Sequence, residues 1–158
     1  RIVRAQTLDE IYETLLAVPS FGPFLAFQFA VDINYSNVTE SGEEGFVVAG
    51  PGAKNGIHKC FSNCPRGRES DIIMWVAETQ DAHFSRLGLN FRLPAARRLQ
   101  PIDCQNLFCE VDKYTRISHP HFTPHNGRSR IKQVFDATGR GPLSPMFVPP
   151  KWRAGAPT

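Results

Sequence analysis

Apolar residues in the first part of the chain recur at the three- and four-residue spacing of amphipathic helices. One such stripe follows Thr7 and ends before Pro19; its members are Leu8, Ile11, Leu15 and Leu16. Thr7 and Glu10 have the spacing of a capping box at the start of this helix. A second, largely apolar helix is expected from about residue 24 to residue 33. The first thirty-odd residues therefore predict two helices joined by a tight turn.

The same pattern predicts a short helix at 53–61, a long amphipathic segment at 71–89 and a helix at 102–117. We expect Trp75, in the long segment, to lie in the core with Ile72, Val76, Thr79 and Phe84. No strand-like alternation of apolar and polar residues is sustained. The fold class is therefore predicted to be all-α, with a helical domain at 1–138. Residues 118–158 are expected to form an irregular arm that ends in a Pro/Gly-rich tail at 139–158. The anchors that pack this arm are expected to be Phe122, Ile131, Val134, Phe135 and Trp152.

The helix at 102–117 carries two neighbouring stripes. Its apolar stripe, expected to face the core, consists of Cys104, Leu107, Phe108 and Val111. Asp103, Asn106 and Glu110 form the second stripe, which Tyr114 closes. Two carboxylates and an amide at the lip of a core are unusual, because long Lys or Arg side chains suit that position better. The second stripe is therefore a candidate site.

Composition describes one ordinary globular domain of 158 residues with a net charge of +3. The basic residues cluster, which fits a polyanionic partner such as DNA as well as a solvated charged face. No apolar run is long enough to span a membrane. The chain begins at Arg1 and not at Met, which suggests an excised domain or a processed chain.

Four cysteines are too few for a disulfide scaffold at this length, and their spacings match no standard zinc or iron–sulfur motif. A zinc site completed by His58, His119, His121 or His125 is the minor alternative. We expect no metal and no cofactor. The cysteines favour a reduced, intracellular protein, nuclear in a eukaryote and cytoplasmic in a phage or bacterium.

The stretch "LLAVPSFGPFLAFQFA" has the form of a helix, a hairpin and a second helix. Gly22 would let a phosphate approach the backbone, and the N–H groups of the second helix would point at it. This is the physics of a helix-hairpin-helix, although a plain αα-hairpin has a similar sequence. Ser20 and Gly22 are therefore candidate phosphate ligands.

The order of this hairpin, an apolar helix and "FVVAGPGAKNGI" resembles the helix-hairpin-helix DNA glycosylases. In those enzymes the corresponding segment carries a catalytic aspartate at the start of a helix. Here the stretch from Val48 to Gly52 has no carboxylate. The usual glycosylase route is thus expected to be absent, or transferred to Asp103 or Glu110.

Four blocks, including "DCQNLFCEVDKYTR" and "GRSRIKQVF", more closely resemble a helical domain of phage DNA hypermodification enzymes. That group contains the helical domain of 5-hydroxymethyluracil DNA kinases. It also contains the α-glutamyl/putrescinyl-thymine pyrophosphorylases, which act as amino acid:DNA transferases. The resemblance implies a domain that recognises a modified thymine in DNA, or acts on it by transferring an amine to the activated base. The sequence lacks GxxxxGK[ST], so a kinase activity would reside on a separate partner domain.

Under this resemblance, the second stripe would line a pocket for an extruded base. Asp103 or Glu110 would act as general base, Asn106 would contact a pyrimidine edge, and Gln105 and Tyr114 would complete the base pocket. The expected DNA or phosphate ligands are Ser20, Gly22, Gly50, Gly52, Lys54, Lys59, Arg128, Arg130 and Lys132.

Each element of this site also has a structural interpretation. Asp103 follows Pro101 and suits a helix cap, and Glu110 with Lys113 suits an ordinary surface pair. Gly-Pro-Gly at 50–52 suits a simple turn. Three functions stay open at this stage. The chain is an enzyme, a DNA-binding module, or a protein-interaction domain that docks a partner through its tail.

Overall fold

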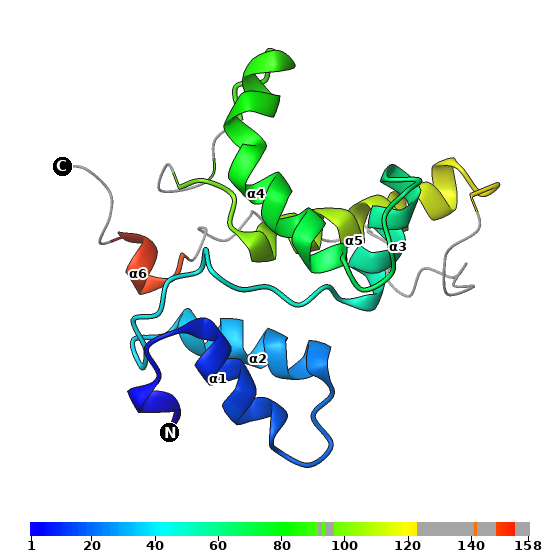
Figure 1. Cartoon of the computed structure of the whole chain (residues 1–158). Helices are drawn as coiled ribbons and strands as arrows, with labels where there is room; N and C mark the ends of the chain where they lie inside the picture. Colours follow the sequence, from blue (N-terminus) through cyan, green and yellow to red (C-terminus); the bar gives the residue numbers. More distant parts are fainter. Residues whose placement is uncertain (92, 94–96, 123–140, 142–147, 154–158) are drawn as a thin grey trace.

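The computed structural model describes residues 1–91, 93, 97–122, 141 and 148–153. Among these residues every regular element is helical, as the sequence predicted (Figure 1). The elements are η1 (Ile2–Arg4), α1 (Leu8–Leu16), α2 (Pro23–Asn34), α3 (Pro51–Cys60), α4 (Glu69–Arg86), α5 (Pro101–Ser118) and α6 (Pro150–Arg153). None of the helices in the described ranges has both the length and the apolar character of a membrane span.

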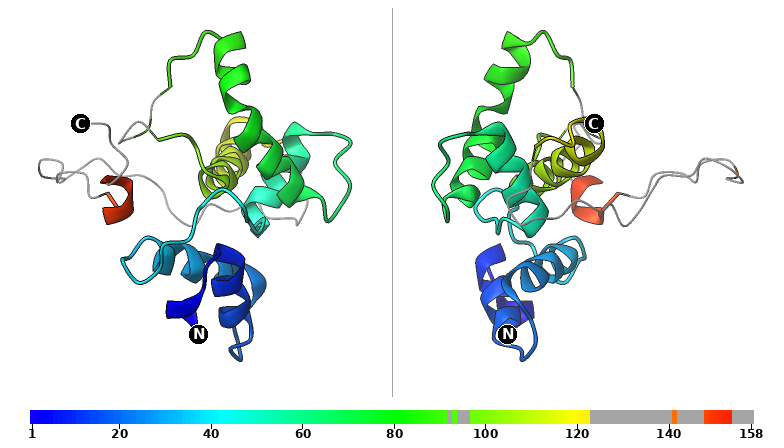
Figure 2. Two further views of the ribbon diagram at one scale, coloured as in Figure 1. Left: turned by 60° about the vertical axis from the view of Figure 1, so that its left-hand side comes forward. Right: turned by 90° about the vertical axis from the view of Figure 1, so that its right-hand side faces the viewer.

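The helices form two groups, with α1 and α2 in one and α3, α4 and α5 in the other (Figures 1 and 2). The segment that enters α3 runs between them and joins their cores. Its Phe46 ring lies 5.0 Å from the ring of Tyr12 and 5.8 Å from that of Phe27. Val47 and Ala49 are also buried, so the two groups share one hydrophobic core.

Helices α3 and α5 pack unusually closely, and glycine is the reason. A Cβ on Gly52 would lie 2.5 Å from Cys109 Sγ, and one on Gly56 would lie 2.0 Å from the carbonyl oxygen of Phe108. Neither position has room for a side chain at the present helix spacing. The Gly-Pro-Gly stretch was predicted to be a turn, but Pro51 and Gly52 are the first residues of α3, because proline at the first helical position needs no N–H partner.

The buried face of α5 is rotated from the predicted one. Leu107 is 50% exposed, whereas Gln105 and Asp112 are fully buried. Cys104 and Phe108 are buried as predicted. Gln105 was predicted to line the base pocket and Asp112 was given no role, but both find polar partners inside, as described below. Trp75, expected in the core, is 43% exposed, because Ile73 and Ala77 form the buried face of α4.

Two smaller predictions also need correction. Thr7 is the N-cap of α1, but its side chain makes no capping bond, and Glu10 accepts from the N–H of Gln6 at 2.8 Å. Phe122 is 47% exposed and anchors no core, whereas Trp152 is anchored as predicted. Ile131, Val134 and Phe135 lie outside the described residues.

Candidate nucleic-acid interface

A cavity of about 320 Å³ lies between the first turns of α2 and α3. Its lining comes from these two helix starts and from the segment that enters α3: Pro23, Phe24, Val48, Ala49, Pro51, Lys54 and Asn55. The cavity is therefore built by the two segments that the sequence marked for phosphate binding.

Gly50 lets the two helix starts meet. A Cβ at this position would lie 2.4 Å from Cε2 of the Phe24 ring. Gly22 and Gly50 are the N-caps of α2 and α3, and each is followed by a proline at the first helical position. The repeated Gly-Pro pair thus gives two helix starts of the same kind, and the missing Cβ of Gly50 brings them together.

Both helix starts are electropositive. The first helical bonds are those from Ala26 to Gly22 and from Lys54 to Gly50, each 2.9 Å. The N–H groups that precede Ala26 in the first turn of α2 therefore have no partner within the helix. At the start of α3, the N–H of the buried Ala53 bonds to the sulfur of Cys109 on α5. Neither N-cap makes a side-chain hydrogen bond, and neither first turn contains an acidic residue. With the exposed Lys54 at its edge, the cavity suits an anion.

The predicted phosphate ligands have different surroundings. Ser20 and Gly22 are both exposed in the hairpin. The positive backbone angle of the hairpin, a φ of 75°, belongs to Ser20, whereas Gly22 has an ordinary φ of −81°. The N–H of Gly50 donates to Oε1 of Gln105 at 3.3 Å. Gly52 faces Cys109 on α5. The structure thus gives Gly50 and Gly52 packing roles. Arg128, Arg130 and Lys132 lie outside the described residues.

Lys59 is directed inward, where it belongs to the α3–α5 ion-pair cluster formed by Lys59, Asp112 and Arg116. Its ammonium lies 2.8 Å from Asp112 Oδ1 and 2.7 Å from Thr115 Oγ1, and Arg116 also pairs with Asp112. The exposed fractions of the three charged side chains are 7%, 0% and 9%. The Lys59 ammonium is therefore committed to holding α3 against α5, which speaks against a phosphate role.

The predicted stripe on α5 does not form one pocket. Asp103 Oδ2 accepts from the N–H of Gln100 at 2.8 Å, as a capping residue does, and lies 2.8 Å from Arg97 Nη2. Asn106 and Tyr114 are exposed. Glu110 pairs with Lys113 at 2.6 Å on the surface. The capping and surface-pair interpretations are thus confirmed, and the catalytic roles stay predictions.

Gln105, predicted to line the base pocket, is fully buried. Its Oε1 accepts from Gly50, and its Nε2 donates to Asn106 Oδ1 at 2.7 Å. It therefore fixes the start of α3 to α5 and does not face a ligand in this conformation.

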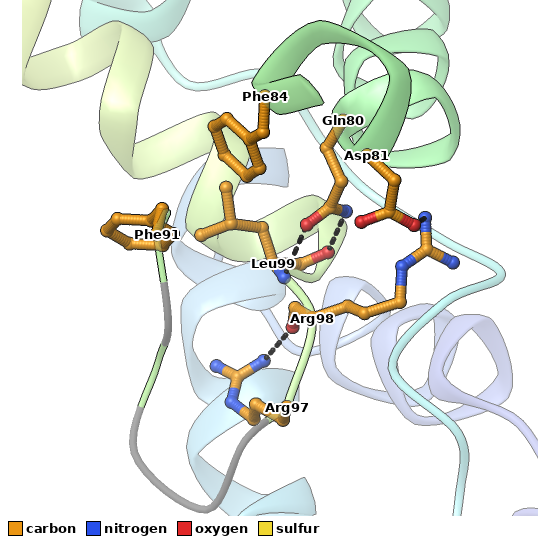
Figure 3. Close-up of a pocket in the computed structure, with 7 residues that line it drawn as sticks. All are labelled: Gln80, Asp81, Phe84, Phe91, Arg97, Arg98 and Leu99. Atoms are coloured by element: carbon orange, nitrogen blue, oxygen red, sulfur yellow. Dashed lines mark hydrogen bonds and ion pairs between the residues drawn. The ribbon is translucent and has the colours of Figure 1, made fainter. Parts of the chain in front are cut away.

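A second cavity, of about 190 Å³, lies beside the C-terminal half of α4 (Figure 3). The rings of Phe84 and Phe91 lie on one side of it. The Gln80 amide donates to the carbonyl of Leu99 at 2.9 Å and accepts from the N–H of Leu99 at 2.8 Å. Since this amide is fully used by the backbone, it holds the 97–100 segment in place and is not free to bind a ligand.

Sequence reasoning missed one part of the interface. Phe24 was not among the predicted phosphate ligands, yet its ring lines the cavity. Outside the interface, sequence reasoning also missed the pair formed by Arg97 and Glu43, which lie 3.8 Å apart and come from loops without a motif. No group of three or more His, Cys, Asp or Glu side chains that suits a metal ion occurs in the part of the chain that the structure describes.

Comparison with known proteins shows which family the chain belongs to. A sequence profile described as "5-hmdU DNA kinase, helical domain" matches residues 1–124. A 5-hmdU DNA kinase of Bacillus phage SP10 is 23% identical over 115 residues, which is 68% of this chain and 18% of the relative. The chain thus spans less than a fifth of that relative's length. No solved structure matches the chain significantly, and the resemblance to glycosylases stays a prediction. Because the profile covers well over half of its residues, the chain belongs to the family of 5-hmdU DNA kinase helical domains.

Proposed function

We propose that this helical domain binds DNA within hydroxymethyluracil DNA modification and holds the DNA backbone at the cavity between α2 and α3. Family membership supports the biological context, since the profile and the phage relative both carry the name of a DNA kinase. The observation that carries the proposal is the pairing of two electropositive helix starts around one cavity with an exposed lysine at its edge.

The proposed contact combines backbone N–H donors with one exposed cation, the ammonium of Lys54. A phosphate in the cavity would accept from the first-turn N–H groups of α2, and the dipoles of both helices would add attraction. Lys54 would supply a point charge without imposing a fixed geometry. Such a contact positions DNA without identifying its sequence, so it acts on modified and unmodified DNA alike.

Catalysis is a separate hypothesis. Asp103 and Glu110 remain candidate general bases, although the first is held by Arg97 and the second lies on the open surface. DNA duplexes containing pyrophosphorylated 5-hydroxymethyluracil, incubated with amino acids or polyamines, would show a mass change if the domain transfers an amine, because the amine nitrogen bonds to the methylene carbon as pyrophosphate leaves. Loss of that change in Asp103→Asn or Glu110→Gln, with binding retained, would assign the role. An unchanged mass throughout would leave a binding module.

The protein-interaction alternative depended on the tail from residue 139 onward. Part of that tail, α6, docks on the domain itself through Trp152, which donates to Glu43 at 2.9 Å. This contact is intramolecular and does not favour an external partner.

Fluorescence anisotropy of a labelled 20-base-pair duplex, measured between about 50 and 200 mM salt, tests the DNA contact. In Lys54→Gln we expect weaker binding to all duplexes and a salt slope smaller by about one. Lys113→Gln is the control, because it removes the same charge from an exposed site on α5 that does not line the cavity. Equal losses in the two variants would indicate diffuse charge attraction, and the proposed site would then be wrong.

A further inference from the structure

The indole of Trp152 fills a polar, aromatic pocket at the C-terminal end of α2. Its Nε1 donates to Glu43 Oε1 at 2.9 Å. The Arg97 guanidinium lies over its ring, 3.8 Å from the centroid, and the Tyr35 ring meets it edge-on at 5.4 Å. We call this set, Tyr35, Glu43 and Arg97, the Trp152 pocket.

The Trp152 pocket holds the indole by the same three contacts that proteins use to hold an unstacked base. A guanidinium lies over the face of a flat ring, an aromatic ring meets it edge-on, and a ring N–H donates to a carboxylate. Glu43 is well placed for this role, since its side chain is only 10% exposed. Its second oxygen lies 3.8 Å from Arg97 Nη1 and has no hydrogen-bond partner among the described residues.

We propose that the Trp152 pocket receives an extruded uracil-type base and that Trp152 is its resident plug. The proposal rests on the proposed DNA-binding function and names the part of the substrate that is recognised. N3 of a uracil-type base carries a hydrogen and would donate to Glu43 as the indole does. N3 of cytosine is an acceptor, and its donor is the exocyclic N4 amino group, so cytosine would have to shift within the pocket to donate to Glu43. The pocket therefore selects uracil-type bases against cytosine.

The plug is held weakly enough to leave. Helix α6 has four residues, and its other described side-chain anchor is Lys151. That ammonium donates to Asn34 Oδ1 at 2.7 Å and to the carbonyl of Ser41 at 3.3 Å, both of them neutral acceptors. Burial lowers the pKa of Lys151, although Glu43 and Glu40 oppose the shift, so burial of this cation costs free energy. A base that brings its own DNA backbone contacts could displace this segment.

The two sites are compatible with one duplex. The cavity between α2 and α3 lies at the start of α2, and the Trp152 pocket lies at its end. A helix of 12 residues is about 18 Å long. That length corresponds to about five base-pair steps, at roughly 3.4 Å per step along one strand. A phosphate and an extruded base from a single helical turn of DNA would therefore reach both.

Fluorescence of Trp152 reports directly on the plug. In Trp75→Phe, Trp152 is the remaining tryptophan of the two in the chain. We would titrate this variant with duplexes that carry one mismatched 5-hydroxymethyluracil, thymine or cytosine, and follow emission and acrylamide quenching. We expect 5-hydroxymethyluracil and thymine to expose the indole, with a red shift and stronger quenching, and cytosine to leave it covered.

Two further variants test the chemistry. Trp152→Ala should bind the 5-hydroxymethyluracil duplex several-fold more tightly, because no plug must be displaced. Glu43→Gln keeps the shape of the side chain but offers an amide that also donates to cytosine N3. The preference over cytosine should then fall by roughly tenfold, the value of one hydrogen bond to a charged group. Thermal melts followed by circular dichroism check that both variants fold.

The outcomes separate this proposal from the proposed function. If all duplexes bind with strong salt dependence but Trp152 emission is the same for each base, the pocket proposal is overturned and DNA binding stands. If no duplex binds, the pocket can still be tested with free nucleosides. We would titrate Trp152→Ala with 5-hydroxymethyl-2′-deoxyuridine and with 2′-deoxycytidine and measure binding to each by NMR chemical shifts. Selective binding of the uridine supports the pocket without DNA binding, and equal or absent binding refutes it.

Discussion

Replacing Gly56 by alanine tests the claim that glycine sets the spacing of α3 and α5. The new Cβ would lie 2.0 Å from the carbonyl oxygen of Phe108 and 2.9 Å from its carbonyl carbon. An ordinary C···O contact is about 3.3 Å. Both neighbours are backbone atoms, so no side-chain rotation relieves the overlap, and the helices must separate by about 1 Å at this point.

The expected cost follows from two opposing terms. Overpacking of this kind costs about 3 kcal/mol, at the upper end of the usual range. Alanine in place of a helical glycine returns about 1 kcal/mol through its higher helix propensity. The free energy of unfolding should therefore fall by about 2 kcal/mol, which lowers Tm by about 4–8 °C for a chain of this size.

Urea denaturation followed by far-UV circular dichroism measures this change, with Gly45→Ala as the control. A Cβ on Gly45 meets nothing within 4 Å, so that variant should keep or slightly raise the stability. Gly52→Ala adds an internal check, because its Cβ meets the sulfur of Cys109 at 2.5 Å. Cys109→Ala should then rescue much of the Gly52→Ala loss. Equal stability of the Gly56 and Gly45 variants, or no rescue, would show that glycine does not set the helix spacing.

Three further predictions concern the charged and titratable groups. Asp112→Asn removes the buried carboxylate that pairs with Lys59, and a urea titration should show a loss of about 3 kcal/mol. A loss below about 1 kcal/mol would contradict the cluster's role. Burial alone would raise the pKa of Glu69, but hydrogen bonds from His58 and a backbone N–H lower it below its ordinary 4.5. This stabilisation is present above pH 4.5 and is lost as the pH falls through the lower folded pKa, so a Glu69→Gln variant should show a flatter stability profile between pH 3 and 5. Burial, with a smaller contribution from a neighbouring carboxylate, raises the pKa of Cys104 to about 11. Iodoacetamide at pH 8 should therefore alkylate the exposed Cys60 first and Cys104 only on unfolding, as mass spectrometry would show.

Local sequence determined most of the helical elements. The predicted helices at 24–33, 53–61 and 102–117 lie within two residues of α2, α3 and α5. Proline at the first helical position and apolar periodicity are local signals, and they act before any tertiary contact forms. The two Gly-Pro helix starts that line the cavity could therefore be identified from the sequence, and so could the family resemblance.

Tertiary structure alone decided which polar groups face inward. Lys59 and Asp112 are 53 residues apart, and each is buried only because the other neutralises it. Gln105 is buried because the N–H of Gly50 needs an acceptor at that point. Glycines 52 and 56 fit a phosphate loop as well as a helix contact until α5 is placed against them. The Trp152 pocket gathers the C-cap of α2 and residues of two loops, and the indole that fills it comes from α6, so no local pattern marks it. Helix positions follow from short-range chemistry, whereas burial and pairing depend on neighbours that are distant in the chain.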